Sequence, residues 1–390
     1  MPKQLPRNPV QAAVKTWLKD QQPPADEEVE AWGESLLASA PKRFTIYEPM
    51  ALLPCGSFSK PIWTNALEAC TTKSRTALWI LLLKELSVIA KSPLTNLSIN
   101  DGIPLHKDGE SGEENVLRSP TGLRMLHGDF GPSHTADAAP TQEEFDEAFW
   151  VSTKQNGIRQ TWAPRWTMFS RGNVKEKARL LAWQPPSTPA AAGDDDEPWA
   201  VDLYGGIGYF VFSYAALGMR VLCWELNPWS VEGLRRGALA NRWRVRVVSD
   251  AADLARPVDD VLASGEHIVV FQEDNRRAQD RIRRLRQTGV ARRVVHVNGG
   301  LLPTSEQTWE ASWNLARQST AAQTWLHLHE NVGVHDIAAR KAEVEERFKQ
   351  WDAAQGASRE VTVSHVEQVK TFAPGVWHCV FDVCIATPQI

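Results

Sequence analysis

Between Trp199 and Gln350 the chain alternates short apolar runs with amphipathic stretches, and this alternation constrains its fold more than any other feature. The predicted strands are Trp199–Tyr204, Arg220–Leu226, His267–Phe271, Val294–Val297 and Thr324–Leu328. The predicted helices are Ile207–Leu217, Pro228–Asn241, Asp280–Gln287, Glu306–Gln318 and His335–Gln350. Strands that alternate with helices become parallel neighbours through right-handed crossovers. We therefore predict an α/β fold with a Rossmann-like, doubly wound and mostly parallel sheet.

A change in composition separates this region from the rest of the chain. Gln184–Pro198 is rich in proline, alanine and aspartate, which disfavours helix and keeps the segment in solvent. Before it, Asn156-Gly157 stands between two strand-like runs, which is the strongest short-range signal for a hairpin. Val10–Lys19 and Thr64–Ala90 read as helices. The predicted parts are a mixed α+β region at 1–148, a hairpin-bearing connecting domain at 149–183, a linker at 184–198 and the sheet domain at 199–390, which ends in an antiparallel pair at Val361–Thr371 and Trp377–Ile385.

The sharpest local signal is the string Asp202-Leu-Tyr-Gly-Gly-Ile-Gly-Tyr-Phe210. Its glycines follow a strand directly, so the backbone can approach a ligand closely. The second predicted strand ends in Glu225, where a carboxylate can accept two hydrogen bonds from ribose hydroxyls. A dinucleotide fingerprint needs a third glycine where this chain has Val211, so the pattern favours S-adenosylmethionine over NAD. The predicted cofactor residues of this turn are Tyr204, Gly205, Gly206, Gly208 and Glu225.

Composition excludes several classes of protein. No apolar run approaches the roughly 18 residues of a membrane span, and the N-terminus has no apolar core like that of a secretion signal. The 5 cysteines form no CxxC pair, so we expect neither a disulfide framework nor a metal site. His327 and His329 lie on one face of a strand, but other ligand clusters are absent from the sequence. We expect a cytoplasmic protein with no membrane contact and no stable protein partner.

Three longer strings resemble one known family. They are Arg43-Phe-Thr-Ile-Tyr-Glu-Pro-Met-Ala-Leu-Leu-Pro-Cys-Gly-Ser-Phe58, Asn115-Val-Leu-Arg-Ser-Pro-Thr-Gly-Leu-Arg-Met-Leu-His-Gly-Asp-Phe-Gly-Pro132 and Phe169-Ser-Arg-Gly-Asn-Val-Lys-Glu-Lys177. With the glycine turn, they resemble the wybutosine-synthesis aminocarboxypropyltransferases of the class I methyltransferase-like superfamily, and the fungal branch most. The resemblance implies transfer of the 3-amino-3-carboxypropyl group of S-adenosylmethionine to C7 of 4-demethylwyosine at position 37 of tRNA(Phe). The implied by-product is methylthioadenosine.

The resemblance also implies roles for individual residues. Cofactor contacts map onto Ser170, Lys177, Glu225 and the pair Asp274-Asn275. A lysine near the cofactor's carboxylate would hold its methionine arm. Glu176 matches the general base of the related methylating branch and is the candidate proton acceptor.

Two assignments remain open at this stage. Asp250 also follows an apolar run, Val245–Val248, and is an alternative to Asp274 as the residue that contacts adenine. If Asp274 is correct, Val245–Glu266 is an insertion. After the fourth strand, Asn298 is followed by Gly299 where N1-methylating relatives carry Asn-Pro-Pro, which favours aminocarboxypropyl transfer over methylation. Asn298 is a predicted substrate-binding residue.

Arginines supply the candidate contacts to nucleic acid. The net charge is -4, so any phosphate-binding surface must be local. Eight arginines fall within Arg276–Arg293, and Arg283 and Arg284 are the predicted tRNA contacts among them. Arg118 and Arg171, near the connecting domain, are the other two, and we expect the anticodon loop of tRNA(Phe) as the partner. The alternatives are a tRNA guanine-N1 methyltransferase on the same scaffold and a non-catalytic RNA-binding protein.

Overall fold

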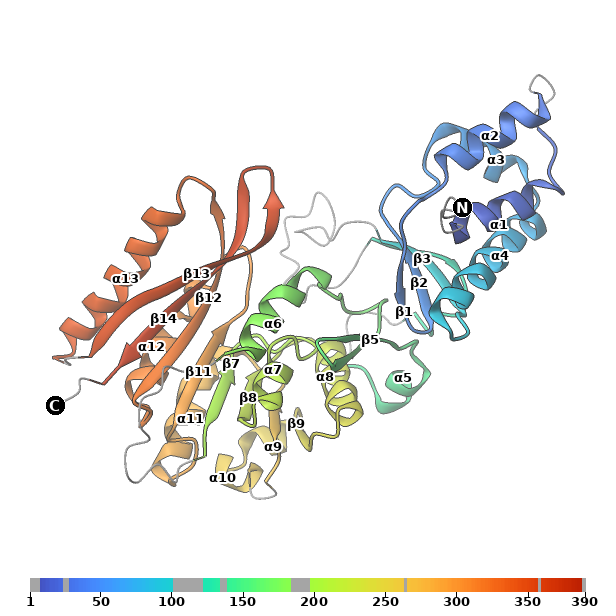
Figure 1. Cartoon of the computed structure of the whole chain (residues 1–390). Helices are drawn as coiled ribbons and strands as arrows, with labels where there is room; N and C mark the ends of the chain where they lie inside the picture. The colour runs from blue at the N-terminus through green and yellow to red at the C-terminus, as the bar shows by residue number, and fades with distance from the viewer. Residues whose placement is uncertain are drawn as a thin grey trace, which may run out of the picture. The chain divides into compact units, whose positions relative to one another are not determined.

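The computed structural model describes residues 8–23, 28–100, 122–133, 139–183, 197–262, 265–356 and 359–387. Its contacts divide the chain into two compact units, coloured along the chain in Figure 1. The first unit comprises 1–153 and 161–169, and the second comprises 154–160 and 170–390. The predicted connecting domain at 149–183 is divided, with part of its residues in each unit. The four-part division of the chain stays a prediction.

The first unit combines helices with a small mixed sheet. Its helices are α1 (Pro9–Leu18), α2 (Val29–Ser39), α3 (Pro61–Ala69), α4 (Thr72–Ala90) and α5 (Gln142–Glu147). Its sheet has the order β1 (Thr45–Tyr47), β2 (Met50–Leu53), β3 (Asn96–Asn100) and β4 (Leu123–His127). The core gathers large aromatic rings, with Trp63 fully buried and packed edge-on against Phe58 at 4.7 Å.

The helix predicted at Thr64–Ala90 is two helices. Cys70 takes an extended conformation, and the Thr71 hydroxyl accepts the backbone N–H of Ser74 at 3.1 Å. This N-cap begins α4 as a separate helix, because the threonine hydroxyl satisfies a backbone N–H that has no partner within the helix.

The predicted hairpin is present. It joins β5 (Val151–Gln155) to β6 (Ile158–Trp162), and Asn156 and Gly157 have φ of 52° and 83° at its turn. Two consecutive positive φ angles define the turn that matches the twist of the flanking strands. Residues 154–160 of this hairpin belong to the second unit.

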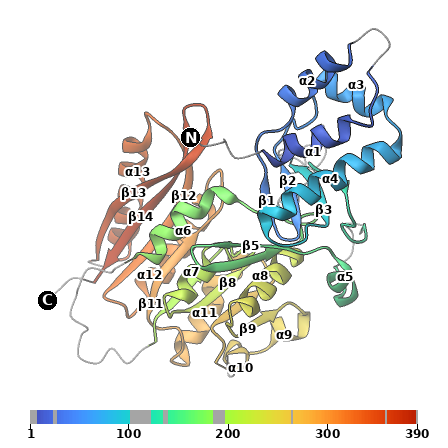
Figure 2. The same cartoon turned by 45° about the vertical axis from the view of Figure 1, so that its right-hand side comes forward.

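The second unit contains an eight-stranded sheet with helices on both faces (Figures 1 and 2). In spatial order its strands are β13 (Glu360–Ala373), β14 (Val376–Ala386), β12 (Gln323–Gly333), β11 (Val294–Gly299), β7 (Trp199–Asp202), β8 (Arg220–Trp224), β10 (Ile268–Phe271) and β9 (Val245–Val248). The β12–β14 and β13–β14 pairs are antiparallel, the second as the sequence predicts, and the other described pairs of this sheet are parallel. The doubly wound, mostly parallel α/β sheet is therefore confirmed.

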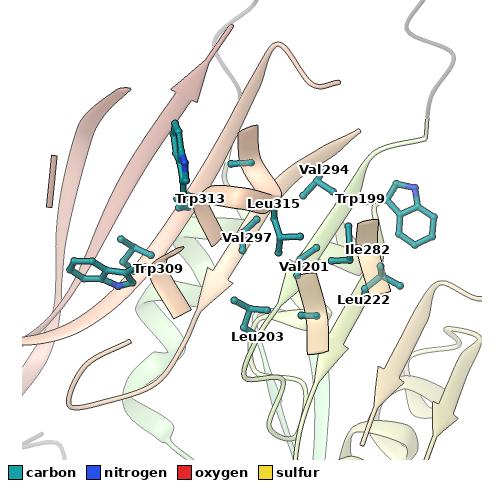
Figure 3. Packing of buried hydrophobic residues seen from close by; sticks show 14 of the residues in the cluster. Trp199, Val201, Leu203, Leu222, Ile282, Val294, Val297, Trp309, Trp313 and Leu315 are labelled. Carbon is teal, nitrogen blue, oxygen red and sulfur yellow. The ribbon is translucent and has the colours of Figure 1, made fainter. Parts of the chain in front are cut away.

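Successive residues of the central strands enter two different cores. Ala200, Val221 and Ile268 pack against α6 (Val174–Leu181), α7 (Val211–Ala216) and α8 (Pro228–Ala240). Val201 and Leu222 pack on the opposite face, against α11 (Ala278–Gln287), α12 (Trp309–Arg317) and α13 (Ile337–Ala354). Figure 3 shows this second cluster. Because both faces are covered, the central strands carry apolar residues on both faces rather than at alternate positions only.

Short elements complete the second unit. They are η1 (Arg171–Asn173), α9 (Ala251–Ala255), α10 (Val258–Val261), η2 (Asn275–Arg277) and η3 (Glu306–Thr308). The helix predicted from Ile207 begins only at Val211, because Gly206 and Gly208 have φ of 52° and 90°, which a right-handed helix excludes.

Candidate active site

A glycine turn follows β7 at the carboxyl edge of the parallel strands, where doubly wound sheets bind their ligands. Gly206 and Gly208 both have positive φ, so a side chain at either position would be strained. A Cβ at Gly208 would lie 2.5 Å from the Phe212 ring, and one at Gly205 would lie 3.3 Å from Cβ of Cys223. The turn therefore favours glycine at these three positions, most strongly at Gly206 and Gly208.

Glu225 lies beside this turn, at the end of the neighbouring strand. Its Oε2 accepts the backbone N–H of Gly206 at 2.9 Å, and its Oε1 accepts that of Asn227 at 2.8 Å. Burial raises the pKa of Glu225, although these two backbone N–H groups act to lower it. A carboxylate has about four acceptor sites, so Glu225 retains capacity for ribose hydroxyls.

The structure bears on the choice between Asp250 and Asp274. Asp274 and Asn275 follow β10, the strand directly next to β8, and Asn275 Nδ2 donates to the Leu203 carbonyl at 2.8 Å. Asp250 follows the edge strand β9, and its side chain accepts the backbone N–H of Asp253 to cap α9. Asn275 is thus joined to the glycine turn, while the side chains of both Asp274 and Asp250 accept a backbone N–H at the start of a short helix.

The stretch Val245–Glu266, expected as an insertion, forms part of the sheet domain. It contains the edge strand β9, followed by α9 and α10. Because β10 lies between β8 and β9, the stretch adds a strand at the rim without displacing β10 from β8.

Lys177 is buried, with 4% of its surface exposed. Its Nζ donates to Oε1 of Gln155 and to Oε1 of Gln160, both at 2.6 Å. It also lies 5.7 Å from the centre of the Tyr209 ring, which belongs to the glycine turn. Burial lowers the pKa of Lys177 to about 7. A cation in this position can bind an anionic ligand group next to the turn.

Ser170 lies near the same turn. Its backbone N–H donates to the Tyr209 hydroxyl at 2.9 Å, and its Oγ accepts from Nζ of Lys370 at 3.0 Å. Its side chain makes no capping bond to the η1 backbone. The predicted cofactor residues Ser170 and Lys177 therefore meet at Tyr209.

Glu176 is fully buried and belongs to a chain of charged groups. Both of its oxygens accept from Arg179, at 2.9 and 2.7 Å, and Arg179 also pairs with the buried Asp382. Asp382 in turn lies 2.7 Å from Nδ1 of His327, whose Nε2 lies 3.0 Å from His296. Glu176 is thus held by a cation inside the protein, and its role as a proton acceptor stays a prediction.

Asp202 and Asn298 face one another across β7 and β11. Asn298 Nδ2 donates to Asp202 Oδ1 at 3.1 Å, and both side chains are fully buried. Within the described residues, Asp202 Oδ2 and Asn298 Oδ1 have no hydrogen-bond partner. Burial raises the pKa of Asp202 to about 6, against the hydrogen bond from Asn298, which acts to lower it. Two unsatisfied acceptors at this edge suit a ligand that donates hydrogen bonds.

The arginine-rich segment divides into structural and exposed members. Arg281 pairs with Glu273, and Arg286 donates to the Leu315 carbonyl at 2.7 Å. Arg283 and Arg284 are exposed on α11, where Arg283 pairs with Asp280 at 2.8 Å. Arg171 is exposed in η1. Arg118, the remaining predicted tRNA contact, lies outside the described residues.

Four residues of this region were not among the predicted site residues. Gln155 and Gln160 lie in a hairpin whose polar residues read as solvent-facing, and Asp382 lies in a strand remote from the motifs. Asp202 ends the first strand of the glycine string, so its position could have identified it. Only the tertiary structure brings the other three to the site.

Two further features are absent from the described part of the chain. It contains no group of three or more His, Cys, Asp or Glu side chains placed to hold a metal ion. It also contains no helix that is both long and apolar enough to cross a membrane.

Comparison with solved structures gives the same fold. Pyrococcus horikoshii TYW2, solved in complex with MeSAdo, aligns with a TM-score of 0.55 at 17% identity, covering 97% of this chain and 100% of that one. Trm5b from Pyrococcus abyssi aligns with a TM-score of 0.52 at 13% identity, covering 90% and 78% of the two chains. The chain therefore has the class I methyltransferase-like fold, with a glycine turn and Glu225 at the carboxyl edge of its sheet.

Sequence relatives narrow the class to one family. No known family profile matches the chain. The Schizosaccharomyces pombe tRNA wybutosine-synthesizing protein 2 is 38% identical over 346 residues, covering 88% of this chain and 72% of the relative. The Saccharomyces cerevisiae protein of the same name is 33% identical over 402 residues, covering 96% and 80%. The chain belongs to the tRNA wybutosine-synthesizing protein 2 family. It is an S-adenosylmethionine-dependent transferase of wybutosine synthesis, as the sequence predicts.

Proposed function

We propose that this protein transfers the 3-amino-3-carboxypropyl group of S-adenosylmethionine to C7 of 4-demethylwyosine at position 37 of tRNA(Phe). The observation that carries the proposal is the buried ammonium group of Lys177 beside the glycine turn. An ammonium group there can bind the carboxylate of the group that is transferred. Membership of the wybutosine family supports the choice of tRNA as substrate.

The reaction asks the protein for orientation more than for acid–base chemistry. S-adenosylmethionine supplies an electrophilic carbon on a sulfonium, whose C–S bond breaks as the new C–C bond forms. Methylthioadenosine leaves as a neutral thioether, and the ring carbon then loses its proton. Because a sulfonium has three carbons open to attack, the residues that orient it decide which one reacts.

We assign the cofactor contacts by their places around the turn. Tyr204, Gly205, Gly206 and Gly208 form the backbone cradle, and Glu225 accepts from the ribose hydroxyls. Asp274 and Asn275, after the strand beside β8, flank the adenine. Lys177 and Ser170 hold the methionine arm.

We assign the acceptor side to other residues. Asn298, with its unsatisfied Oδ1, contacts the tricyclic base, and Glu176 accepts the proton that the ring carbon releases. Arg171, Arg283, Arg284 and Arg118 contact phosphates of the anticodon stem and loop. We also propose that the protein acts in the cytoplasm, where its free cysteines remain reduced.

A single-turnover incubation tests the reaction. The protein is mixed with S-adenosylmethionine and tRNA(Phe) that carries 4-demethylwyosine, and the nucleosides are read by mass spectrometry. We expect the mass gain of an aminocarboxypropyl group together with release of methylthioadenosine. A methyl gain with adenosylhomocysteine would instead assign the protein to guanine-N1 methylation, and no gain despite cofactor binding would favour a non-catalytic RNA-binding role.

A further inference from the structure

We propose that Gln155 and Gln160, two side chains of the β5–β6 hairpin, position Lys177 for the aminocarboxypropyl arm of S-adenosylmethionine. The inference rests on the proposed function and deepens it. It makes the two glutamines positioning residues, which act on the cofactor through Lys177.

The contacts of Lys177 carry the proposal. Both glutamine Oε1 atoms accept from its Nζ at 2.6 Å, which is short for hydrogen bonds of an ammonium group. Gln160 is 1% exposed, and its Nε2 lies 3.4 Å from the carbonyl oxygen of Gly208. One buried amide therefore joins the lysine to the glycine turn.

The hairpin itself is fastened to the sheet domain at two further points. At its turn, Asn156 Nδ2 donates to the carbonyl of Val174, at the start of α6. On β6, the backbone N–H of Arg159 donates to Asn241 Oδ1 at 2.9 Å, and Asn241 Nδ2 returns a bond to the Arg159 carbonyl at 2.6 Å. The hairpin is therefore anchored at the beginning of α6, which carries Lys177, and at the end of α8.

The chemistry of an amide suits this task. An amide oxygen orients an ammonium group without cancelling its charge, whereas a carboxylate in the same place would form an ion pair. Burial already lowers the pKa of Lys177 to about 7, so a bound carboxylate would favour its charged form. Neutral glutamines thus hold Lys177 in place without forming an ion pair with it.

The test compares two ligands that differ only in the transferred arm. S-adenosylmethionine carries the arm, and methylthioadenosine lacks it. For Gln160→Ala, we expect S-adenosylmethionine to bind about tenfold more weakly in isothermal titration calorimetry, because a hydrogen bond to a charged group is lost. For Gln160→Glu we expect at least the same loss, because the new carboxylate competes for Lys177. Methylthioadenosine should bind both variants within about twofold of the wild type.

Two further variants sharpen the assay. Gln350→Ala, on the exposed surface of α13, is the matched control and should bind both ligands as the wild type does. In a Lys177→Met background, Gln160→Glu should no longer change the affinity for S-adenosylmethionine, because the group through which it acts is gone.

Other results would overturn the proposal. Equal loss of both ligands in Gln160→Ala and Gln160→Glu would make the residue a structural support of the turn. An unchanged affinity for S-adenosylmethionine, or the same loss with and without Lys177, would separate the glutamines from the arm. If the wild type bound neither ligand, the proposed function would fall, and this inference with it.

Discussion

Replacing Arg179 by methionine removes the cation that joins two buried carboxylates. Arg179 makes two hydrogen bonds to Glu176 and two to Asp382, and both acidic side chains are fully buried. Methionine fills much of the arginine stem but supplies no charge. Breaking a buried ion pair by removing one partner costs about 3–5 kcal/mol, because the remaining charge is left uncompensated. We expect the free energy of unfolding of Arg179→Met to fall by about that amount near neutral pH.

The loss of stability in Arg179→Met should depend on pH, and the direction of that dependence follows from the pKa of Asp382. In the wild type, burial acts to raise the pKa of Asp382, but the hydrogen bond from His327 and the pair with Arg179 outweigh it, so the pKa is lowered. A lowered folded-state pKa contributes stability above the unfolded value of about 3.9, and this stability is lost as the pH falls. Without Arg179, burial would raise the pKa, and protonation would then relieve the buried charge. The deficit of the variant should therefore shrink as the pH is lowered from about 7.5 to about 5.

Urea unfolding followed by tryptophan fluorescence at both pH values measures the deficit. Arg283→Met is the matched control, since its exposed pair with Asp280 contributes at most about 1 kcal/mol. A loss below about 1 kcal/mol for Arg179→Met would refute the reasoning, and so would a deficit that stays constant with pH.

Three further predictions concern catalysis, tRNA and the cofactor turn. Glu176→Gln should slow single-turnover product formation by about tenfold or more at saturating cofactor while cofactor affinity stays within about twofold; unchanged turnover would remove Glu176 from the mechanism. Reversing the charges of Arg283 and Arg284 should weaken tRNA binding and lower the slope of log affinity against log salt by about one per lost phosphate contact, as filter binding would measure; an unchanged slope would make them ordinary surface residues. Gly208→Ala should weaken S-adenosylmethionine binding and lower the melting temperature more than Gly218→Ala does. The control Gly218 has a similar positive φ, but a Cβ there would meet nothing within 4 Å. Equal effects of the two variants in calorimetry would attribute the loss of stability to backbone strain alone.

Much of the fold followed from local patterns. The alternation of apolar runs and amphipathic stretches predicted the doubly wound sheet, because its central strands are buried on both faces and read as continuous apolar runs. Asn156-Gly157 predicted the hairpin for an equally local reason, since few residues tolerate two positive φ angles in succession.

The boundaries of the helices were harder to predict from the sequence. The prediction of one helix across Cys70 was wrong because the apolar pattern continues through the break. The helix predicted from Ile207 starts later because two glycines of the turn take left-handed conformations. In both cases the apolar periodicity identified a helix, and a cap or a turn decided where that helix begins.

By itself, the sequence predicted the class of cofactor and the glycine turn that we propose binds it. The glycine turn and Glu225 each follow directly after a strand, and these two strands are neighbours in the sheet. Their positions in the sequence are therefore enough to predict that they lie side by side. Tertiary structure decided the rest of the site. Lys177 reads as an exposed helical lysine until the hairpin brings Gln160 against it, and Glu176 reads as a surface acid until Arg179 joins it to Asp382, 203 residues from Arg179 along the chain. Burial changes the charge balance of such groups, and burial depends on which distant segments pack together.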